Sequence, residues 1–457
     1  MSHACHDFHR TRALRDAAPG QGLPTIETGM PTPAGAGLTR RSFLHRATGA
    51  VLAVYGGSAL APAAFDEGIA AAAAAAPSQP VLVSIFCSGG ADSLSMLAPV
   101  GHGEYRKLRP ELALPPSTNP LDVFRDDDSL HWAPQLAGIR DLHREGKVTV
   151  FPGIGYSSPN GSHFTSRHFW DVGKVDPLGR EGWLGRYIDR HGSDANPLQG
   201  LSLKSMLSPS LAPATKPVAT VQWPNEFDFS LQDVWQPELA AGVPEALLRM
   251  AAGHSDAPAL RAAKVAVRQA LALRGDLKPL AAEHDWSKPP MGRRLQSLAD
   301  MLAMGLPVRA VALDADGGYD THAGQEGALP EMLQSLNDAV LAFQRRLERA
   351  DDPLNPGRKL ADRVLVHIWS EFGRRAYENG SGSDHGAAGL SLLIGTRASG
   401  QTIGEFPGLK SLDVEGNLRH TTDFRGLYCS LLEDWLGVDA APIIPGAGGF
   451  ERYAIVG

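Results

Sequence analysis

The chain has 457 residues, which is enough for one large α/β domain with insertions or for two ordinary domains. Its apolar fraction of 43% and charged fraction of 20% are those of an ordinary globular protein. The net charge is −7 and the body of the chain has no basic block, so no nucleic-acid-binding surface is expected.

The first distinctive segment, residues 39–45, reads Thr-Arg-Arg-Ser-Phe-Leu-His. It resembles the twin-arginine export signal, whose paired arginines would be Arg40 and Arg41. The mildly apolar stretch 47–64 follows, but it is short and broken by glycine, whereas a membrane anchor needs about 20 strongly apolar residues. The small residues at 70–76 suit a signal peptidase, which predicts that residues 1–76 are removed by cleavage near Ala76. The alternative is an Ala/Gly/Pro-rich tail that contains Arg-Arg by chance.

The signal predicts that the twin-arginine translocase carries the folded protein to the periplasm, cell envelope or extracellular space, without a permanent membrane anchor. Two of the three cysteines, Cys87 and Cys429, lie in the retained body, each in or at the end of an apolar run. Two predictions stay open for them, buried free thiols or a single disulfide, because an oxidising compartment permits a bridge. The chain has no CxxC motif, which excludes a thiolate zinc site.

In the body, residues 77–457, predicted strands alternate with predicted helices. Apolar, β-branched runs predict buried strands at 81–86, 148–154, 308–313, 364–369 and 390–394. Helical periodicity predicts helices at 133–144, 238–251, 257–273, 293–304 and 329–348. This order predicts an α/β fold, a three-layer sandwich with a mostly parallel central sheet. Residues 195–300 are richer in helix and proline, and are predicted as a helical insertion or cap.

Polar residues lie next to the ends of several predicted strands. Ligands of such sheets bind in the crevice at the carboxyl ends of the strands, so these side chains are expected to converge. In chain order they are Asp92, Ser162, His163, Asp320, His322, Glu371, Arg374, Asp384 and His385. Oxygen and nitrogen ligands without thiolate suit Zn²⁺, Mn²⁺, Mg²⁺ or Ca²⁺, and the imidazoles favour zinc or manganese.

Ser162 opens a predicted helix, where serine usually caps the first turn. The same position favours negative charge, so it also suits an alkoxide nucleophile or a bound oxyanion.

Six short motifs mark the body of the chain. They are Gly89-Gly90-Ala91-Asp92, Ser162-His163-Phe164, Asp320-Thr321-His322, Ser370-Glu371-Phe372-Gly373-Arg374, Asp384-His385-Gly386 and Thr421-Thr422-Asp423-Phe424-Arg425. As a set, over about residues 80–437, they resemble a twin-arginine-exported family, domain of unknown function family 1501. That family is itself similar to the alkaline phosphatase superfamily, which includes the arylsulfatases.

The superfamily resemblance implies roles for these residues. The implied metal ligands are Asp92, Asp320, His322, Glu371 and His385, with Asp384 as a further candidate. Ser162 would be the nucleophile, His163 a base beside it, and Arg374 the residue that grips a tetrahedral anion. The spacing departs from the phosphatases, because Asp320 and His322 are two residues apart instead of four. The chain also has no Cys-x-Pro-x-Arg motif, so it is not expected to be a formylglycine sulfatase.

The function implied is an exported metal-dependent hydrolase of phosphate or sulfate esters, with a serine or a metal-bound water as nucleophile. Its substrate would be a small-molecule or polymer ester. Two alternatives remain: a non-catalytic exported binding protein that retains the fold, and a metal site that serves only stability.

Overall fold

The computed structural model describes residues 29–35, 52–55, 79–194, 196–224, 237–253, 264 and 289–457. Several sequence predictions lie outside these residues. They are the signal arginines Arg40 and Arg41, the cleavage near Ala76, and nearly all of the helix predicted at 257–273.

One large sheet forms the centre of the described residues. Its strands are β1 (Leu52–Tyr55), β2 (Val81–Phe86), β5 (Val148–Gly155), β6 (Gly200–Ser202), β7 (Val218–Val221), β8 (Ala310–Asp314), β9 (Val364–Trp369), β12 (Gly389–Ile394) and β13 (Thr422–Asp423). They are ordered β1-β7-β6-β8-β2-β9-β12-β5-β13. β12 runs antiparallel to β9 and β5, and β1 runs antiparallel to β7, whereas the other neighbours are parallel. The predicted α/β fold with a mostly parallel sheet is therefore confirmed.

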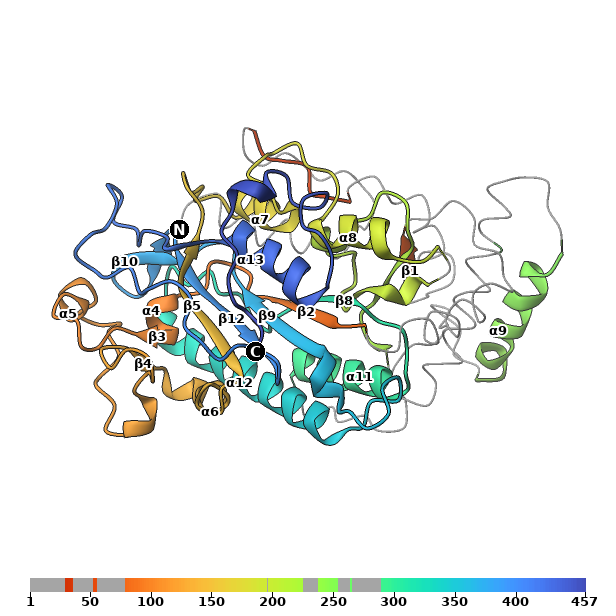
Figure 1. Ribbon diagram of the computed structural model, residues 1–457, viewed down its shortest axis with the longest axis horizontal. Coiled ribbons are helices and arrows are strands. Elements are labelled where there is room, and N and C mark those ends of the chain that lie inside the picture. The colour runs from red at the N-terminus through yellow and green to blue at the C-terminus, as the bar shows by residue number, and fades with distance from the viewer. Residues whose placement is uncertain are drawn as a thin grey trace.

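Helices cover both faces of this sheet (Figure 1). One face carries α6 (Ala137–Arg144), α11 (Pro290–Ala303) and α12 (Gln325–Arg349), and the other carries α7 (His163–Val172), α8 (Trp183–His191) and α13 (Phe424–Ser430). The remaining α-helices of the described residues are α4 (Ser93–Met96), α5 (Tyr105–Leu108) and α9 (Pro237–Ala251). Two small ribbons complete the described strands, β3 (Leu97–Ala98) with β4 (His131–Trp132), and β10 (Arg374–Glu378) with β11 (Ser383–His385).

Strand β2 shows why the sheet is buried on both sides. All six of its residues are buried, and they alternate between two hydrophobic cores. Val81, Val83 and Ile85 pack toward α6, α11 and α12, whereas Leu82 and Phe86 pack toward α7, α8 and α13. Successive strand side chains point to opposite faces, so only a continuous apolar run can fill both cores.

Three strands of the central sheet, β6, β7 and β1, lie in spans for which the sequence predicted other structure. Within the span predicted as a helical insertion, β6 and β7 extend the central sheet. They contain three and four residues, which is too short for an alternating pattern to stand out. β1 lies in the apolar stretch of the predicted export signal and pairs with β7 at the edge of the sheet.

Both described cysteines are free and buried, so the structure has no Cys87–Cys429 disulfide. They belong to the cores on opposite faces of the sheet. Burial raises the pKa of the Cys87 thiol to about 12, which makes it an inert core residue.

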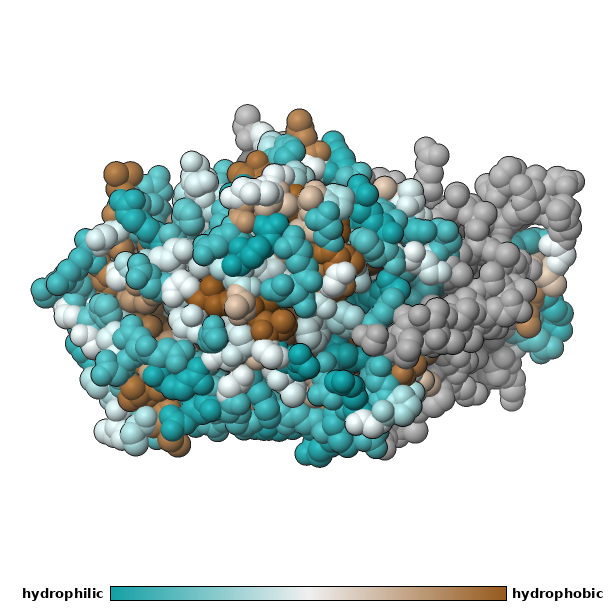
Figure 2. Space-filling model, in the orientation of Figure 1, coloured by the Kyte–Doolittle hydropathy of each residue, from teal (hydrophilic) through white to brown (hydrophobic). Residues whose placement is uncertain are grey.

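The surface of the described residues is mostly polar on the face that Figure 2 shows, and its hydrophobic residues gather there in small separate groups. Within the described residues, no helix combines the length and apolar character that crossing a bilayer requires.

Candidate metal centre

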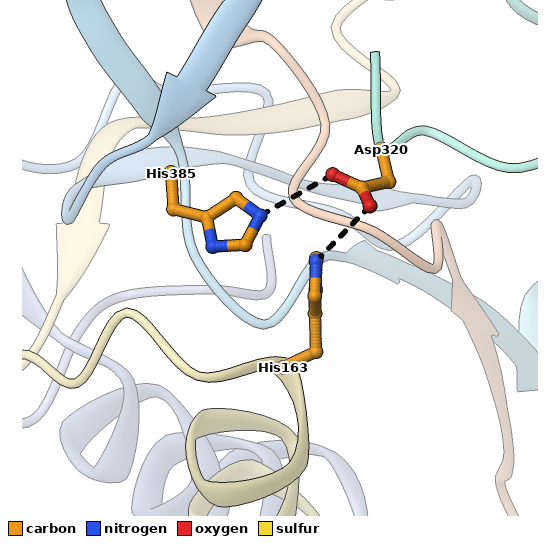
Figure 3. A group of neighbouring side chains, drawn as sticks. All are labelled: His163, Asp320 and His385. Atoms are coloured by element: carbon orange, nitrogen blue, oxygen red, sulfur yellow. Dashed lines mark hydrogen bonds and ion pairs between the residues drawn. The ribbon is translucent and has the colours of Figure 1, made fainter. Parts of the chain in front are cut away.

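Three side chains from distant parts of the chain meet at one end of the sheet (Figure 3). His163 is the first residue of α7, Asp320 follows β8, and His385 ends β11. The carboxylate of Asp320 lies between the two imidazoles. Nε2 of His163 is 3.4 Å from its Oδ2, and Nε2 of His385 is 3.3 Å from its Oδ1. The ligand atoms of the three residues lie within 4.8 Å of one another, so this group could hold a metal ion.

His322 extends the group on the side of Asp320 and His385. Its Nε2 lies 3.1 Å from Oδ1 of Asp320 and 2.9 Å from Nε2 of His385. His322 and His385 are therefore neighbours across the end of the site, and His322 is a candidate fourth ligand.

Each of the three imidazoles is held through Nδ1 by an oxygen acceptor. Nδ1 of His163 lies 2.8 Å from Oε1 of Glu371, and Nδ1 of His322 lies 2.9 Å from Oδ1 of Asp384. Nδ1 of His385 lies 2.7 Å from the carbonyl oxygen of Gly161. A neutral imidazole that donates from Nδ1 has its lone pair on Nε2. The three Nε2 atoms face Asp320, and metal-binding histidines in proteins are oriented in this way.

The spacing of these atoms fits one cation. A tetrahedral zinc ion with bonds of about 2.0–2.1 Å spaces its ligand atoms about 3.3 Å apart. The separations of 3.3 and 3.4 Å between Asp320 oxygens and Nε2 of His385 and His163 agree with that value, whereas the 2.9 Å between Nε2 of His322 and Nε2 of His385 is shorter. The residues present therefore fit a metal bound by nitrogen and oxygen.

Glu371 is buried behind His163 and does not belong to the inner group. The backbone N–H groups of Gly89 and Gly90 donate to its carboxylate at 3.0–3.1 Å. Burial acts to raise the pKa of Glu371, but the hydrogen bonds donated by His163 and by the backbone N–H of Gly89 act to lower it, and the pKa is lowered. Glu371 is thus an ionised carboxylate that fixes the ring of His163.

The turn after β2 has to come very close to this site. Gly89 and Gly90 have φ values of +120° and +77°, which L side chains rarely adopt. A Cβ atom on Gly89 would lie 2.4 Å from the backbone nitrogen of Asp320. Glycine therefore lets the β2 turn reach both the carboxylate of Glu371 and the backbone of the Asp320 loop.

Arg374 is fully buried, and every nitrogen of its guanidinium donates a hydrogen bond within the protein. Nε donates to the carbonyl oxygen of Gly90 and Nη1 to that of Ser383, each at 2.7 Å. Nη2 donates to Oδ1 of Asp320 at 2.7 Å and to the carbonyl oxygens of Gly89 and Tyr319. Arg374 ties the loops together and holds Asp320, so its donors are already used by the protein.

The structure places Asp92 outside the inner group. Asp92 forms a buried two-fold ion pair with Arg109, with Nη2 of Arg109 at 2.9 Å from Oδ1. Ser95 and Gln325 donate to Oδ2, each at 2.6 Å. Burial acts to raise the pKa of Asp92, but Arg109 and these donors lower it. Every strong contact of Asp92 is thus made to protein donors.

Ser162 is the N-cap residue of α7, directly before His163, and its side chain makes no capping hydrogen bond. The backbone carbonyl of the preceding Gly161 accepts from His385. The side chain of His385 is 14% exposed, whereas that of His163 is 1% exposed. The group is therefore buried on the α7 side and open to solvent at His385.

Three contributors to this region were not predicted from the sequence. Arg109 neutralises Asp92, Gln325 donates a hydrogen bond to it, and the carbonyl of Gly161 orients His385. No motif marks them, because a buried arginine has no pattern of its own and a backbone carbonyl has no sequence signal. The turn-forming residue types Asn160 and Gly161, directly before Ser162, are the one sequence signal for the loop whose carbonyl orients His385.

The sequence pattern of a family described as "Protein of unknown function (DUF1501)" matches residues 163–435. The match begins at His163 and includes Asp320, His322 and His385, whereas Asp92 precedes it. A search of curated proteins finds no match to the chain. Since the family match covers more than half of the chain, the chain belongs to the DUF1501 family of proteins of unknown function.

Proposed function

We propose that this chain is a metal-dependent hydrolase of phosphate or sulfate esters. The observation that carries the proposal is the convergence of His163, His322 and His385 on the carboxylate of Asp320. The donor set, imidazole nitrogen and carboxylate oxygen without sulfur, suits zinc or manganese better than magnesium or calcium.

The chemistry follows from that donor set. A bound divalent ion lowers the pKa of a neighbouring water or hydroxyl and stabilises negative charge on the transferred group. Glu371, Asp384 and the Gly161 carbonyl hold the imidazoles in place. Ser162 is the candidate nucleophile, because it precedes His163 at the start of α7, where the helix dipole favours an alkoxide.

We further propose that the fold is of the alkaline phosphatase type. The mostly parallel sheet, with the candidate site at the loops that follow β2, β8 and β9, supports this likeness. The contacts of Asp92 and Glu371 differ from the two-metal ligand set that the superfamily implies, because both carboxylates are bonded to protein donors. A single metal is therefore the simpler expectation.

His322 supports a second candidate function. If His322 also bound the ion, the group of three would become one of four protein ligands, which is typical of structural zinc sites, whereas catalytic sites usually keep one position open. In that case the metal would stabilise a non-catalytic exported protein.

The test uses protein exported by its own signal, loaded in turn with Zn²⁺, Mn²⁺, Mg²⁺ and Ca²⁺, with p-nitrophenyl phosphate and sulfate as substrates. Turnover is expected with a transition metal, and is expected to disappear in His163→Ala and His385→Ala. His420→Ala is the matched control, because His420 is exposed and outside the group. If the melting temperature depends on metal but turnover does not exceed that of the His163→Ala variant, the result would favour a metal that serves only stability.

The nucleophile is tested separately with Ser162→Ala. Loss of turnover with retained metal content would assign the step to the serine hydroxyl. Retained turnover would assign it to a water.

We also propose export through the twin-arginine translocase, on the basis of the sequence at 39–45. Replacing Arg40 and Arg41 with lysine should leave the protein in the cytoplasm, whereas the unchanged chain should be found outside it. Cleavage near Ala76 would also remove β1, so that β7 would become the edge of the mature sheet.

A further inference from the structure

Arg167 lies one helical turn after His163 on α7, so the two side chains occupy the same face of the helix. Its guanidinium carbon is 4.2 Å from the centre of the Phe86 ring, a cation–π contact at the carboxyl end of β2. Its Nε donates to Oδ2 of Asp171 at 3.2 Å. Stacking and this single hydrogen bond fix the plane of the guanidinium.

The two terminal nitrogens of this guanidinium have no acceptor within the described part of the chain. Nη1 and Nη2 of Arg167 donate no hydrogen bond to any described residue, and the side chain is 12% exposed. Arg374 and Arg109 differ, because both Nη atoms of each donate to protein acceptors. Arg167 is therefore a nearly buried arginine with two terminal donors left for a ligand.

The surroundings of Arg167 place it beside the candidate metal centre. Phe86, beneath it, pairs with Asp314 of β8 and Trp369 of β9, so Arg167 lies over the carboxyl ends of three adjacent parallel strands. Ser166, its neighbour in α7, donates to the carbonyl oxygen of Glu371 at 2.6 Å. Ligands of parallel sheets bind along this edge.

The charge of Arg167 is maintained despite burial. Burial acts to lower its pKa, but the nearby carboxylates of Asp171, Asp314 and Glu371 raise it. A second cation lies along the same edge, because Nζ of Lys204 is 2.7 Å from Asp314. Arg167 is thus a permanent cation on the same helix face as His163.

We propose that Arg167 binds the tetrahedral oxyanion, phosphate or sulfate, of a ligand at this edge of the sheet. The planar guanidinium offers two parallel N–H donors that match two oxygens of such an anion. The role that the sequence suggested for Arg374 would then belong to Arg167. The proposal deepens the proposed function, but anion binding itself requires no turnover.

The experiment titrates inorganic phosphate and sulfate separately into the full chain, with and without Zn²⁺, and measures binding by calorimetry. The unchanged protein should bind at least one of the two anions. Arg167→Gln should weaken that binding by about 10–100-fold, because it removes charged hydrogen bonds. Arg167→Lys keeps the positive charge but loses the two parallel N–H donors of the guanidinium, so its anion affinity should fall by less than that of Arg167→Gln.

Arg425→Gln is the matched control. Arg425 is also stacked on a phenylalanine, 4.4 Å from the Phe450 ring, and bonded to an aspartate, Asp423, but both its Nε and Nη2 donate to that carboxylate. This variant should bind phosphate and sulfate as the unchanged protein does. If Arg167→Gln does not fold, the anion affinity of Arg167→Lys is compared with that of the unchanged protein instead.

The outcomes separate this proposal from the proposed function. Binding that depends on Arg167, without turnover under any metal, would support the anion site and contradict the hydrolase. Turnover and anion affinity that are both unchanged in folded Arg167→Gln and Arg167→Lys would overturn the anion site alone. Absence of binding by the unchanged protein at millimolar anion, in both metal states, would also overturn it.

Discussion

Oε1 of Glu371 lies 2.8 Å from Nδ1 of His163, and both side chains are almost completely buried. This contact joins the turn after β9 to the first residue of α7. Because a carboxylate behind an imidazole fixes both the tautomer and the direction of the ring, the other ring nitrogen is aimed at Asp320. The pair therefore connects the fold to the candidate metal centre.

Glu371→Gln tests this relationship. The substitution keeps the shape but removes the charge that orients His163, so metal affinity should fall by about 10–100-fold. A competition titration against a chelator measures it. Glu433→Gln, at a carboxylate paired with Arg452 on the surface, serves as control and should bind metal normally. Equal affinity in both variants would show that Glu371 does not support the site.

Asp92→Asn separates a structural from a ligating role for Asp92. The change leaves Arg109 buried without its counter-charge, which should lower the free energy of unfolding by about 3–5 kcal/mol. The metal content of the chains that remain folded should not change. Denaturant unfolding and elemental analysis of the same sample give both values. Lost metal with unaltered stability would instead support the ligand role that the superfamily resemblance implies.

Acid should destabilise the protein through buried neutral histidines. Burial lowers the pKa of His367 to about 3 and that of His143 to about 4. As pH falls below about 6.5, the unfolded chain binds protons that the folded chain does not, so stability falls. Each such histidine contributes a slope of about 1.4 kcal/mol per pH unit down to its folded pKa.

His367→Phe tests that slope between pH 7 and pH 5. His367 lies in the core, bonded to Ser391. The variant should lose about 2 kcal/mol of the change in unfolding free energy between pH 7 and pH 5, measured in guanidinium at each pH, because the full slope of about 1.4 kcal/mol per pH unit applies only below pH 6.5. An unchanged slope would mean that His367 is protonated in the folded state.

Gly89→Ala should damage the site from the backbone side. The added methyl group would meet the backbone of Asp320, at a φ that alanine rarely adopts. Metal binding should be lost together with stability. Gly146→Ala is the matched control, since Gly146 has a φ of +78° and its Cβ would meet nothing within 4 Å. If both variants retain metal equally, close packing at Gly89 is not needed for the site.

Strands that form a continuous apolar run, and helices with a clear hydrophobic stripe, were predictable from the sequence. The runs at 81–86 and 364–369 match β2 and β9 residue for residue, because both faces of these strands are buried. The helix predicted at 329–348 lies within α12, whose buried stripe includes Leu333, Leu336 and Val340. β6 and β7 were missed, because strands of three or four residues have too few positions to show a period.

The candidate site was predictable in position but not in the contacts of each side chain. Asp320 follows the parallel strand β8, and His385 precedes β12, which runs antiparallel to β9, so both residues lie at the same edge of the sheet and their proximity follows from the fold. Which hydrogen-bond donor contacts each carboxylate depends on the conformation of loops, and these loops have no hydrophobic periodicity from which it could be predicted. Arg109 reaches Asp92 from a separate loop, and Arg374 turns inward to the carbonyls of neighbouring turns.

The most direct measurement is X-ray absorption at the metal edge of the protein exported by its own signal, together with its metal content. We expect about one transition-metal ion per chain, with nitrogen and oxygen neighbours, outer-shell scattering from at least two imidazoles, and no sulfur. A chain that contains no stoichiometric metal, or binds one without imidazole, would contradict it.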